Sequence, residues 1–352
     1  MAAQDLDQAS GAQCVLVTGG SGFIASHLIL RLLHAGYKVR TTIRTPSREK
    51  ELRNTFQNAG VDTESHLSFV VADLTKDEGW ANAMEGCTFV QHVASPFPAA
   101  TPRDENELIR PAREGTLRVL KFARDAEVKR VVLTSSFAAI GYGHEQMPVF
   151  TEDHWSVVDG KISVPAYHKS KTLAEKAAWN FVQKEGGNLE LAVINPTGVF
   201  GPVLSRDFST SIQIIESMMK GDLPACPNIS FGAVDVRDLA DLHILAMTNP
   251  AAIGQRFIGT CDNGPVSMID IANVLREEKP DYATLVPTKV LPNFLVRAVA
   301  LFRSDLRVIL PELGVTKLIN NEKVKTVLGW KPRPIEECVL DTADSLVEHS
   351  IV

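Results

Sequence analysis

Short apolar runs alternate with amphipathic stretches along the first half of the chain. Unbroken apolar runs of this length are typical of strands buried on both faces of a parallel sheet. They are CVLVT (14–18), KVRTTI (38–43), LSFVVA (67–72), TFVQHVA (88–94), RVVLTS (130–135) and LELAVI (189–194). Amphipathic helical patterns lie between them, at 23–35, 47–58, 77–85, 105–126 and 166–185. The alternation predicts an α/β fold with a doubly wound parallel sheet of the Rossmann type.

The pattern loosens after Pro196, where a Gly/Pro-rich turn, PTGVFGP, begins. Shorter helical and strand-like segments follow, which indicates a smaller C-terminal substrate domain. The amphipathic stretch 234–247 predicts a helix that returns to the sheet domain. We therefore expect a dinucleotide-binding domain over 1–196 joined by 234–260, and a substrate domain made of 197–233 and 261–352. The apolar stretch 291–310 is expected to form core or dimer contacts.

Composition narrows the possible partners. The 352 residues are 45% hydrophobic and carry a formal charge of −6, without a Lys/Arg cluster, so nucleic acid is not expected as a partner. No apolar run approaches the roughly 18 residues of a membrane span, and the acidic N-terminus lacks a leader pattern. The five cysteines form no CxxC pair, and no histidine stands at metal-ligand spacing. We expect a cytoplasmic monomer or homodimer with reduced thiols and no metal.

A glycine-rich loop follows the first predicted strand. In TGGSGFIA (18–25), Gly19 and Gly22 precede Ala25 at the spacing of a dinucleotide fingerprint, with Ala in the third, helix-packing place. Glycines there permit a tight turn and bring backbone N–H groups against a pyrophosphate at the positive end of a helix. Phe23 and Ile24 open that helix. The loop predicts dinucleotide binding.

The end of the second predicted strand indicates which dinucleotide binds. A site for NAD places an acid there for the ribose 2′-hydroxyl, whereas a site for NADP places an arginine against the 2′-phosphate. Here the strand ends TTIRTPSREK, with Arg44 in that position and no acid before Glu49. The residue favours NADP(H). Arg48 or Lys50 is expected to assist, and the sequence does not choose between them.

Tyr167 and Lys171 lie four positions apart in AYHKSKTLAEKAAW (166–179), which has the composition of a helix. They share one face of that helix. Lowering the pKa of a phenol from about 10 by three units requires about 4 kcal/mol. An ammonium about 4 Å away supplies about that much at an effective dielectric of 20. A surface pair is the alternative, but the glycine loop and the double serine Ser135-Ser136 favour a catalytic acid.

Together these segments resemble the short-chain dehydrogenase/reductase superfamily, and its extended branch in particular. TGGSGFIASHL, LTSSFAA, YHKSK and PTGVFGP follow the order of that branch's motifs. GYKVRTTIR and LGWKPRPIEECVLDTADSL are similar to the dihydroflavonol-reductase-like and yeast aldehyde-reductase-like group. The resemblance covers roughly residues 13 to 348.

The resemblance implies roles for individual residues. The catalytic set would be Ser136, Tyr167 and Lys171, with Ser136 chosen over its neighbour Ser135. Lys171 would also bond the nicotinamide ribose. The remaining cofactor contacts would be Asp73 and Leu74 beside the adenine, Ala94 and Ser95 along the ribose and phosphates, and Pro196 near the nicotinamide. The helical stretch RPAREGTLRVLKFA lacks the asparagine of classical members.

Apolar and aromatic side chains are candidates for the substrate pocket: Phe97, Phe137, Tyr142, Phe200, Leu204 and Phe208. Such a pocket suits small to medium aldehydes and ketones. The expected reaction is reduction of the carbonyl to an alcohol, with hydride from NADPH and a proton from Tyr167. Alternatives that share the motifs are a nucleotide-sugar epimerase or dehydratase and a 3β-hydroxysteroid dehydrogenase-like enzyme. Outside enzymes, the alternative is an NADP-sensing regulatory protein.

Overall fold

The apolar runs of the sequence form the strands of one parallel sheet. The computed structural model describes residues 13–96, 104–302 and 309–352. Within them, seven parallel strands lie in the order β3-β2-β1-β4-β5-β6-β11. The strands are β1 (Cys14–Val17), β2 (Lys38–Ile43), β3 (Leu67–Val71), β4 (Cys87–His92), β5 (Arg130–Thr134), β6 (Glu190–Pro196) and β11 (Arg256–Gly259). The doubly wound α/β fold predicted from the sequence is confirmed.

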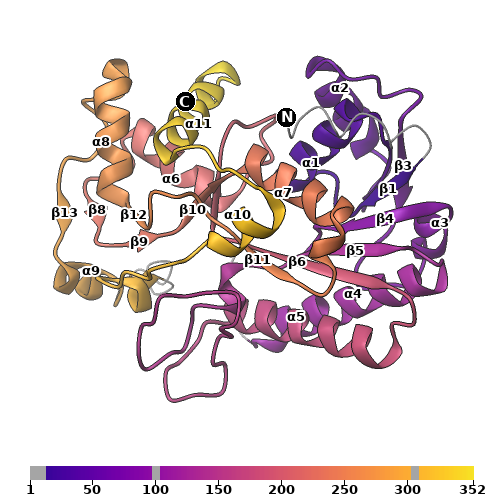
Figure 1. Ribbon diagram of the computed structural model, residues 1–352. Coiled ribbons are helices and arrows are strands. Elements are labelled where there is room, and N and C mark those ends of the chain that lie inside the picture. Colours follow the sequence, from indigo (N-terminus) through magenta and orange to yellow (C-terminus); the bar gives the residue numbers. More distant parts are fainter. Residues whose placement is uncertain (1–12, 97–103, 303–308) are drawn as a thin grey trace.

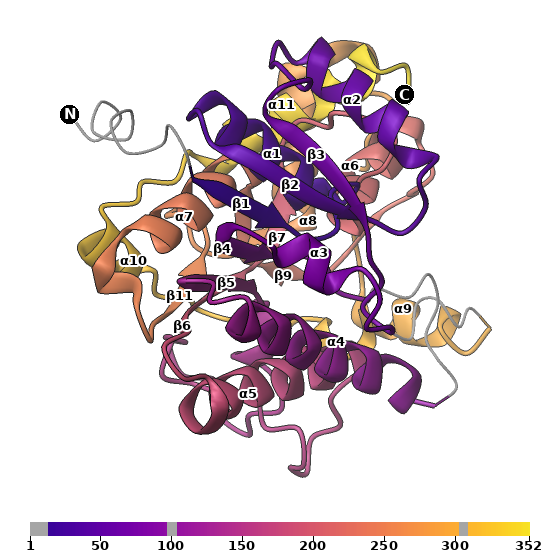
Figure 2. The ribbon, with the colours of Figure 1, turned by 90° about the vertical axis from the view of Figure 1, so that its right-hand side faces the viewer.

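Helices cover both faces of the sheet, as Figures 1 and 2 show. One face is covered by α3 (Trp80–Met84), α4 (Asn106–Asp125) and α5 (Ala166–Glu185), and the other by α1 (Phe23–His34), α2 (Arg48–Asn58) and α7 (Val236–Thr248). Along β1, Val15 and Val17 point into the core on the α1 side, whereas Leu16 points into the core on the α4 side. Burial on both faces explains why the strands are apolar at successive positions.

The strand order reverses between β1 and β4, because the chain builds outward from β1 in both directions. In an open parallel sheet, ligands bind in the crevice beyond the carboxyl ends of the strands at this switch point. The fold therefore positions a ligand site beside the loops that follow β1 and β4.

Helix α3 is shorter than the sequence predicts. The pattern indicates a helix over 77–85, but the helix begins only at Trp80. Gly79 precedes it with a left-handed φ of 87°, a conformation that glycine adopts without steric cost. The chain therefore turns at Gly79, and the helical segment starts after the turn.

The second half of the chain contains shorter elements. Its small strands pair as β7 (Gly198–Phe200) with β10 (Ala233–Asp235), β8 (Cys226–Pro227) with β13 (Val290–Leu291), and β9 (Ser230–Phe231) with β12 (Val266–Ser267). Its helices are α6 (Thr210–Lys220), α8 (Met268–Glu278), α9 (Asn293–Val299), α10 (Glu322–Leu328) and α11 (Ile335–Glu348). The segment 234–260 supplies α7 and β11 to the sheet region. In the apolar stretch 291–310, α9 is helical, and residues 303–308 lie outside the described part.

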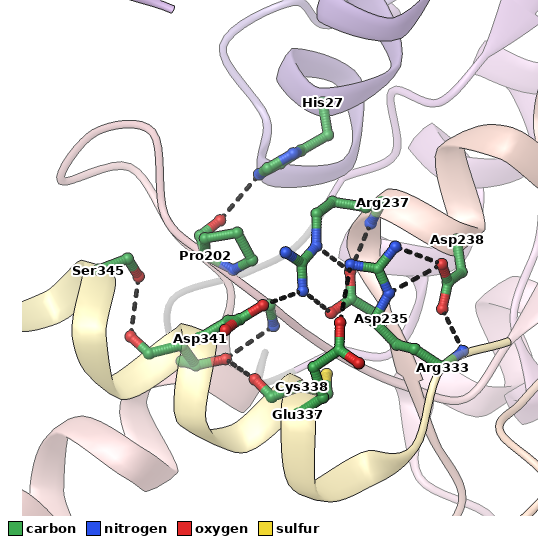
Figure 3. A network of polar contacts seen from close by, with 12 residues as sticks. His27, Pro202, Asp235, Arg237, Asp238, Arg333, Glu337, Cys338, Asp341 and Ser345 are labelled. Carbon is green, nitrogen blue, oxygen red and sulfur yellow. Dashed lines mark hydrogen bonds and ion pairs between the residues drawn. The ribbon is translucent and has the colours of Figure 1, made fainter.

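One continuous apolar core joins the two halves. It runs from the α1 side of the sheet into side chains of α6, α8 and α11. At its margin Arg237 of α7 forms ion pairs with Asp235 and with Asp341 of α11, at 2.7 and 2.6 Å (Figure 3). Nearby, Arg333 pairs with Asp238 at 2.9 Å. The C-terminal helix is thus fixed to the sheet region by packing and by charge.

Candidate active site

The glycine loop after β1 is a tight turn. Gly19 has a φ of 73°, and its N–H donates to the hydroxyl of Thr42 at 2.9 Å. The N–H of Gly22 donates to the carbonyl of Gly19 at 2.9 Å. A Cβ atom at Gly19 would lie 3.0 Å from the Cβ of Ala94, so a side chain there would crowd the loop that follows β4. Gly19 and Ala94, both predicted cofactor contacts, therefore lie together.

The loop leads into a helix end that is open to an anion. Gly22 is the N-cap of α1 and has no side chain to bond the N–H groups of the first turn, where Phe23 and Ile24 stand. No acidic residue occurs in that turn. Unpaired N–H groups and the helix dipole favour a negative group at this point. These residues fit the pyrophosphate of a dinucleotide.

The carboxyl ends of β2 and β3 carry the predicted adenosine contacts. Arg44 follows β2 directly and is exposed. The hydroxyl and N–H of Thr75 lower the pKa of the Asp73 carboxyl, and the charge of Arg44 lowers it further. Leu74 packs against Gly115 of α4, where an added Cβ would lie 3.0 Å from the Leu74 side chain. Arg44, Asp73 and Leu74 thus gather at the edge of the switch-point crevice.

The two cations that could assist Arg44 differ in their surroundings. Arg48 is paired with Asp207 and, at 3.2 Å, with Glu51. Lys50 is exposed, and within the described ranges no ion pair involves it. The structure therefore leaves the ammonium of Lys50 freer than the guanidinium of Arg48 to meet a phosphate.

The two adjacent serines after β5 face different partners. The Ser135 hydroxyl donates to the Glu175 carboxylate at 2.6 Å. The Ser136 hydroxyl accepts from the N–H of Ala138 at 3.1 Å, as the cap of the short helix η2 (Phe137–Ala139). It also lies close enough to the Tyr167 phenol to lower the pKa of that phenol. Only Ser136 of this pair therefore reaches the phenol.

Burial controls the titration of the pair on α5. It raises the pKa of Tyr167, while the bond from Ser136 opposes the shift. It lowers the pKa of Lys171 to about 8, while the charge of Glu175 opposes the shift. The sequence argument predicts a phenol made more acidic by the ammonium. In this structure the direction is the reverse, because removal of the phenol from water outweighs the favourable contacts.

The buried face of α5 that carries Tyr167 and Lys171 also carries a residue that the sequence analysis did not identify. Glu175, one turn beyond Lys171, is 1% exposed and accepts from Ser135, from Asn195 at 2.8 Å and from Arg256 at 2.5 Å. A carboxylate at i+8 from Tyr167 on the buried helix face is the sequence signal that could have found it. This network fixes α5 against β5, β6 and β11, and so sets the position of Lys171.

The predicted pocket residues do not all line an open site. Phe200 has no exposed surface and stacks on Phe231 in the main core, with ring centroids 5.9 Å apart. Phe137 is 7% exposed and packs edge-on against Phe150 and Tyr142. The structure thus places Phe200 in the core rather than at a pocket surface, because its ring fills the space between β7 and β9.

The other pocket candidates lie at partly exposed positions. Tyr142 packs against His168, which follows Tyr167 in the chain, with ring centroids 3.8 Å apart. Leu204 and Phe208 are partly buried in the segment after β7, and Phe97 lies outside the described residues.

Two further residues were predicted as cofactor contacts. Ser95 is partly buried in the loop after β4, and Pro196 is the last residue of β6.

Fold and site together define a dinucleotide-binding protein in which a serine after the carboxyl end of β5 faces a Tyr-Lys pair on α5. The chain belongs to the NAD dependent epimerase/dehydratase family, whose model matches residues 15–258, and thus to the extended short-chain dehydrogenases/reductases. The resemblance read from the sequence motifs is confirmed.

Named relatives and a solved structure are reductases. The chain is 35% identical to cinnamoyl-CoA reductase CAD2 of Medicago truncatula, over 95% of each chain. It is 36% identical to dihydroflavonol 4-reductase of Zea mays, over 78% of this chain and 76% of that one. The yeast methylglyoxal/isovaleraldehyde reductase Gre2, solved with NADPH, superposes with a TM-score of 0.79 at 28% identity, over 97% of this chain and all of that one.

In the described parts of the chain, no helix has the length and apolar character that would let it cross a bilayer.

Proposed function

We propose that this chain reduces an aldehyde or ketone to the corresponding alcohol, with Tyr167 as the proton donor. The chain is an NADP-dependent oxidoreductase, in keeping with its family and with reductase relatives along its whole length. The observation that carries the finer proposal is the approach of the Ser136 hydroxyl to the Tyr167 phenol, whose pKa it lowers, beside the buried Lys171.

The cofactor would be held by groups already described. The loop of Gly19 and Gly22 and the first turn of α1 would bind the pyrophosphate, and Arg44 with Lys50 would bind the 2′-phosphate. Lys171 would bond the nicotinamide ribose hydroxyls. When bound, NADPH supplies the hydride.

Ser136 is placed to orient the carbonyl oxygen. Its oxygen accepts from the N–H of Ala138, and its one hydrogen, directed toward Tyr167 in this structure, would turn to the oxygen of a bound carbonyl. A donor fixed by a helix cap needs no reorganisation when negative charge develops on the substrate oxygen. Ser136 therefore stabilises the charge that grows during reduction.

Tyr167 is placed to deliver the proton. Because burial holds its pKa above the ordinary value of about 10, the phenol keeps its proton at neutral pH. An alkoxide is a stronger base than a phenolate, so the proton passes to the substrate oxygen as the charge develops. A protonated phenol is the state that reduction needs.

The main rival within the family is a nucleotide-sugar epimerase or dehydratase. An exposed arginine, rather than an acid, follows β2. This residue favours NADP(H), which exchanges during turnover, and disfavours the tightly bound NAD of an epimerase.

A panel of aldehydes, ketones and keto esters tests the proposal. The purified chain is mixed with NADPH or NADH, and loss of nicotinamide absorbance is followed with product analysis. We expect turnover with NADPH on at least one carbonyl class and formation of the alcohol. Tightly bound NAD in the purified protein, together with no NADPH consumption on any carbonyl, would overturn it in favour of an epimerase.

A further inference from the structure

Two cysteine side chains meet at the amino end of the sheet, away from the glycine loop. Cys14 opens β1 and Cys87 opens β4, and they are register partners in these neighbouring strands. Their sulfur atoms lie 3.4 Å apart. Paired strands run about 4.8 Å apart, which lies within the Cα separation of about 4.4 to 6.8 Å that a disulfide spans. The backbone therefore holds the two sulfurs close to bonding position.

Positive charge surrounds this pair. Lys38 is the register partner of Cys14 on β2, and Arg40 donates to the Cys87 sulfur at 3.6 Å. The bond from the Cys87 thiol, followed by the charges of Arg40 and Lys38, lowers the pKa of Cys14 to about 7, although burial raises it. The pKa of Cys87 is raised by its bond to Cys14 and by burial. Near neutral pH, Cys14 is therefore the sulfur that is partly thiolate, and Cys87 stays a thiol.

Cys14 differs from the other cysteines in its exposure to solvent. Among the five thiols, Cys14 is partly exposed and the remaining four are buried. Burial raises the pKa of Cys226, Cys261 and Cys338. An oxidant in solution therefore meets the nucleophilic sulfur of Cys14 first.

We propose that Cys14 and Cys87 are an oxidisable dithiol that a hydroperoxide converts to an intramolecular disulfide. The Cys14 thiolate attacks one peroxide oxygen, the O–O bond breaks, and the leaving oxygen takes a proton and departs as alcohol or water. Cys14 is then a sulfenic acid. The Cys87 sulfur attacks the Cys14 sulfur, an S–S bond forms, the S–O bond breaks, and the proton of Cys87 leaves with that oxygen as water. Two thiols lose two electrons, and the peroxide gains them.

The location of the pair separates this chemistry from carbonyl reduction. The glycine loop, Ser136 and Tyr167 lie toward the carboxyl ends of the strands, whereas both cysteines stand at the amino ends. Oxidation is therefore expected to leave the reductase turnover within about twofold. It should raise the melting temperature, because the bond closes a long loop between β1 and β4.

Stepwise addition of hydrogen peroxide to the reduced full-length protein tests the proposal. Free thiols are alkylated and counted under denaturing conditions, and digests are searched for a Cys14–Cys87 peptide. We expect the thiol count to fall from five to three, with the cross-link as the main product. The rate should rise with pH to half its maximum near pH 7, following the pKa of Cys14.

Three variants provide the controls. Cys14→Ser should abolish the cross-link and slow peroxide consumption by at least about tenfold. Cys87→Ala should leave Cys14 trapped as a sulfenic acid that a cyclic dione labels. Cys261→Ser should cross-link like the natural chain. Two outcomes in the natural chain would overturn the proposal. One is oxidation of Cys14 to sulfinic acid without a cross-link, and the other is survival of all five thiols in excess peroxide. Neither measurement depends on how a variant folds.

Discussion

At the scale of single residues, two adjacent serines have separate tasks because their hydroxyls face different sides of the chain. The Ser135 hydroxyl donates to Glu175, whereas the Ser136 hydroxyl lies against Tyr167 and lowers its pKa. The family resemblance points to the second serine. The sequence alone does not choose, because both residues are serine at the end of the same strand. Only the packing of α5 against β5 separates them.

Replacing each serine in turn tests this assignment. In the proposed mechanism, Ser136→Ala removes the donor to the substrate oxygen, so kcat should fall by about a hundredfold or more. Ser135→Ala removes one of several donors to Glu175, so the free energy of unfolding should fall by about 1 kcal/mol while kcat changes far less. Steady-state kinetics and urea unfolding on both variants provide the measurement. Equal losses of kcat in the two would contradict the assignment.

The pH profile of reduction reports on Lys171. Its pKa is lowered by burial to about 8, so the ammonium is present below that pH and lost above it. If the ammonium is needed, kcat/KM for reduction should be flat below about pH 8 and fall above it.

A conservative variant separates this effect from unfolding. Lys171→Arg should have lower activity but no fall near pH 8, because a guanidinium keeps its charge. Lys169→Arg, two positions away and paired with Glu105, should retain the natural profile. A fall near pH 8 in Lys171→Arg would assign the titration to another group.

At the scale of elements, the period of the apolar pattern predicts most of the sheet region. The strands and helices up to β6 follow from runs such as CVLVT and from helical spacing. Strands buried on both faces of the sheet need apolar residues at successive positions, so they can be found in the sequence. The pattern does not reveal tertiary contacts between residues that are far apart in the chain. The role of Glu175 depends on partners far away in the chain, and Phe200 has the character of a pocket residue but is covered by Phe231. The shortening of α3 depends on the left-handed turn at Gly79.

The joint between α7 and α11 yields a prediction about stability (Figure 3). Asp235 is 2% exposed and depends on Arg237 for its charge partner. Arg237→Met would leave that carboxylate buried without its ion-pair partner, so the free energy of unfolding should fall by about 3 kcal/mol or more. Chemical denaturation measures the change.

A matched change at an exposed pair provides the control. Arg31 pairs with Asp241, and both side chains are more than a third exposed. Arg31→Met should cost less than about 1 kcal/mol. Similar costs for the two variants would show that the α7–α11 joint does not depend on the charge of Arg237.

At the scale of the whole molecule, one core connects the sheet region with the C-terminal elements, so the chain should unfold cooperatively. A ligand that binds only the folded chain then stabilises all of it, by about 2.7 kcal/mol at a hundred times its Kd. If Arg44 binds the extra phosphate as proposed, NADPH should raise the melting temperature more than NADH at equal concentration.

The charge at Arg44 is the test of that preference. Arg44→Asp should reverse the ranking of the two cofactors in the melting assay. Lys161→Asp, a similar change of charge on an exposed side chain outside the crevice, should leave the ranking intact. A natural chain that NADH stabilises more than NADPH would show that the arginine does not select the cofactor.

The central claim is that the phenol of Tyr167 gives the proton to the reduced substrate. The most direct measurement is the turnover of Tyr167→Phe with NADPH and the best carbonyl of the panel, together with NADPH affinity by fluorescence titration. The control is Tyr282→Phe, at a partly buried tyrosine in the short helix that follows α8. We predict unchanged NADPH affinity with kcat lowered by at least about a hundredfold, and natural turnover in the control. Turnover of Tyr167→Phe within a few-fold of the natural chain, at equal NADPH affinity, would contradict the account.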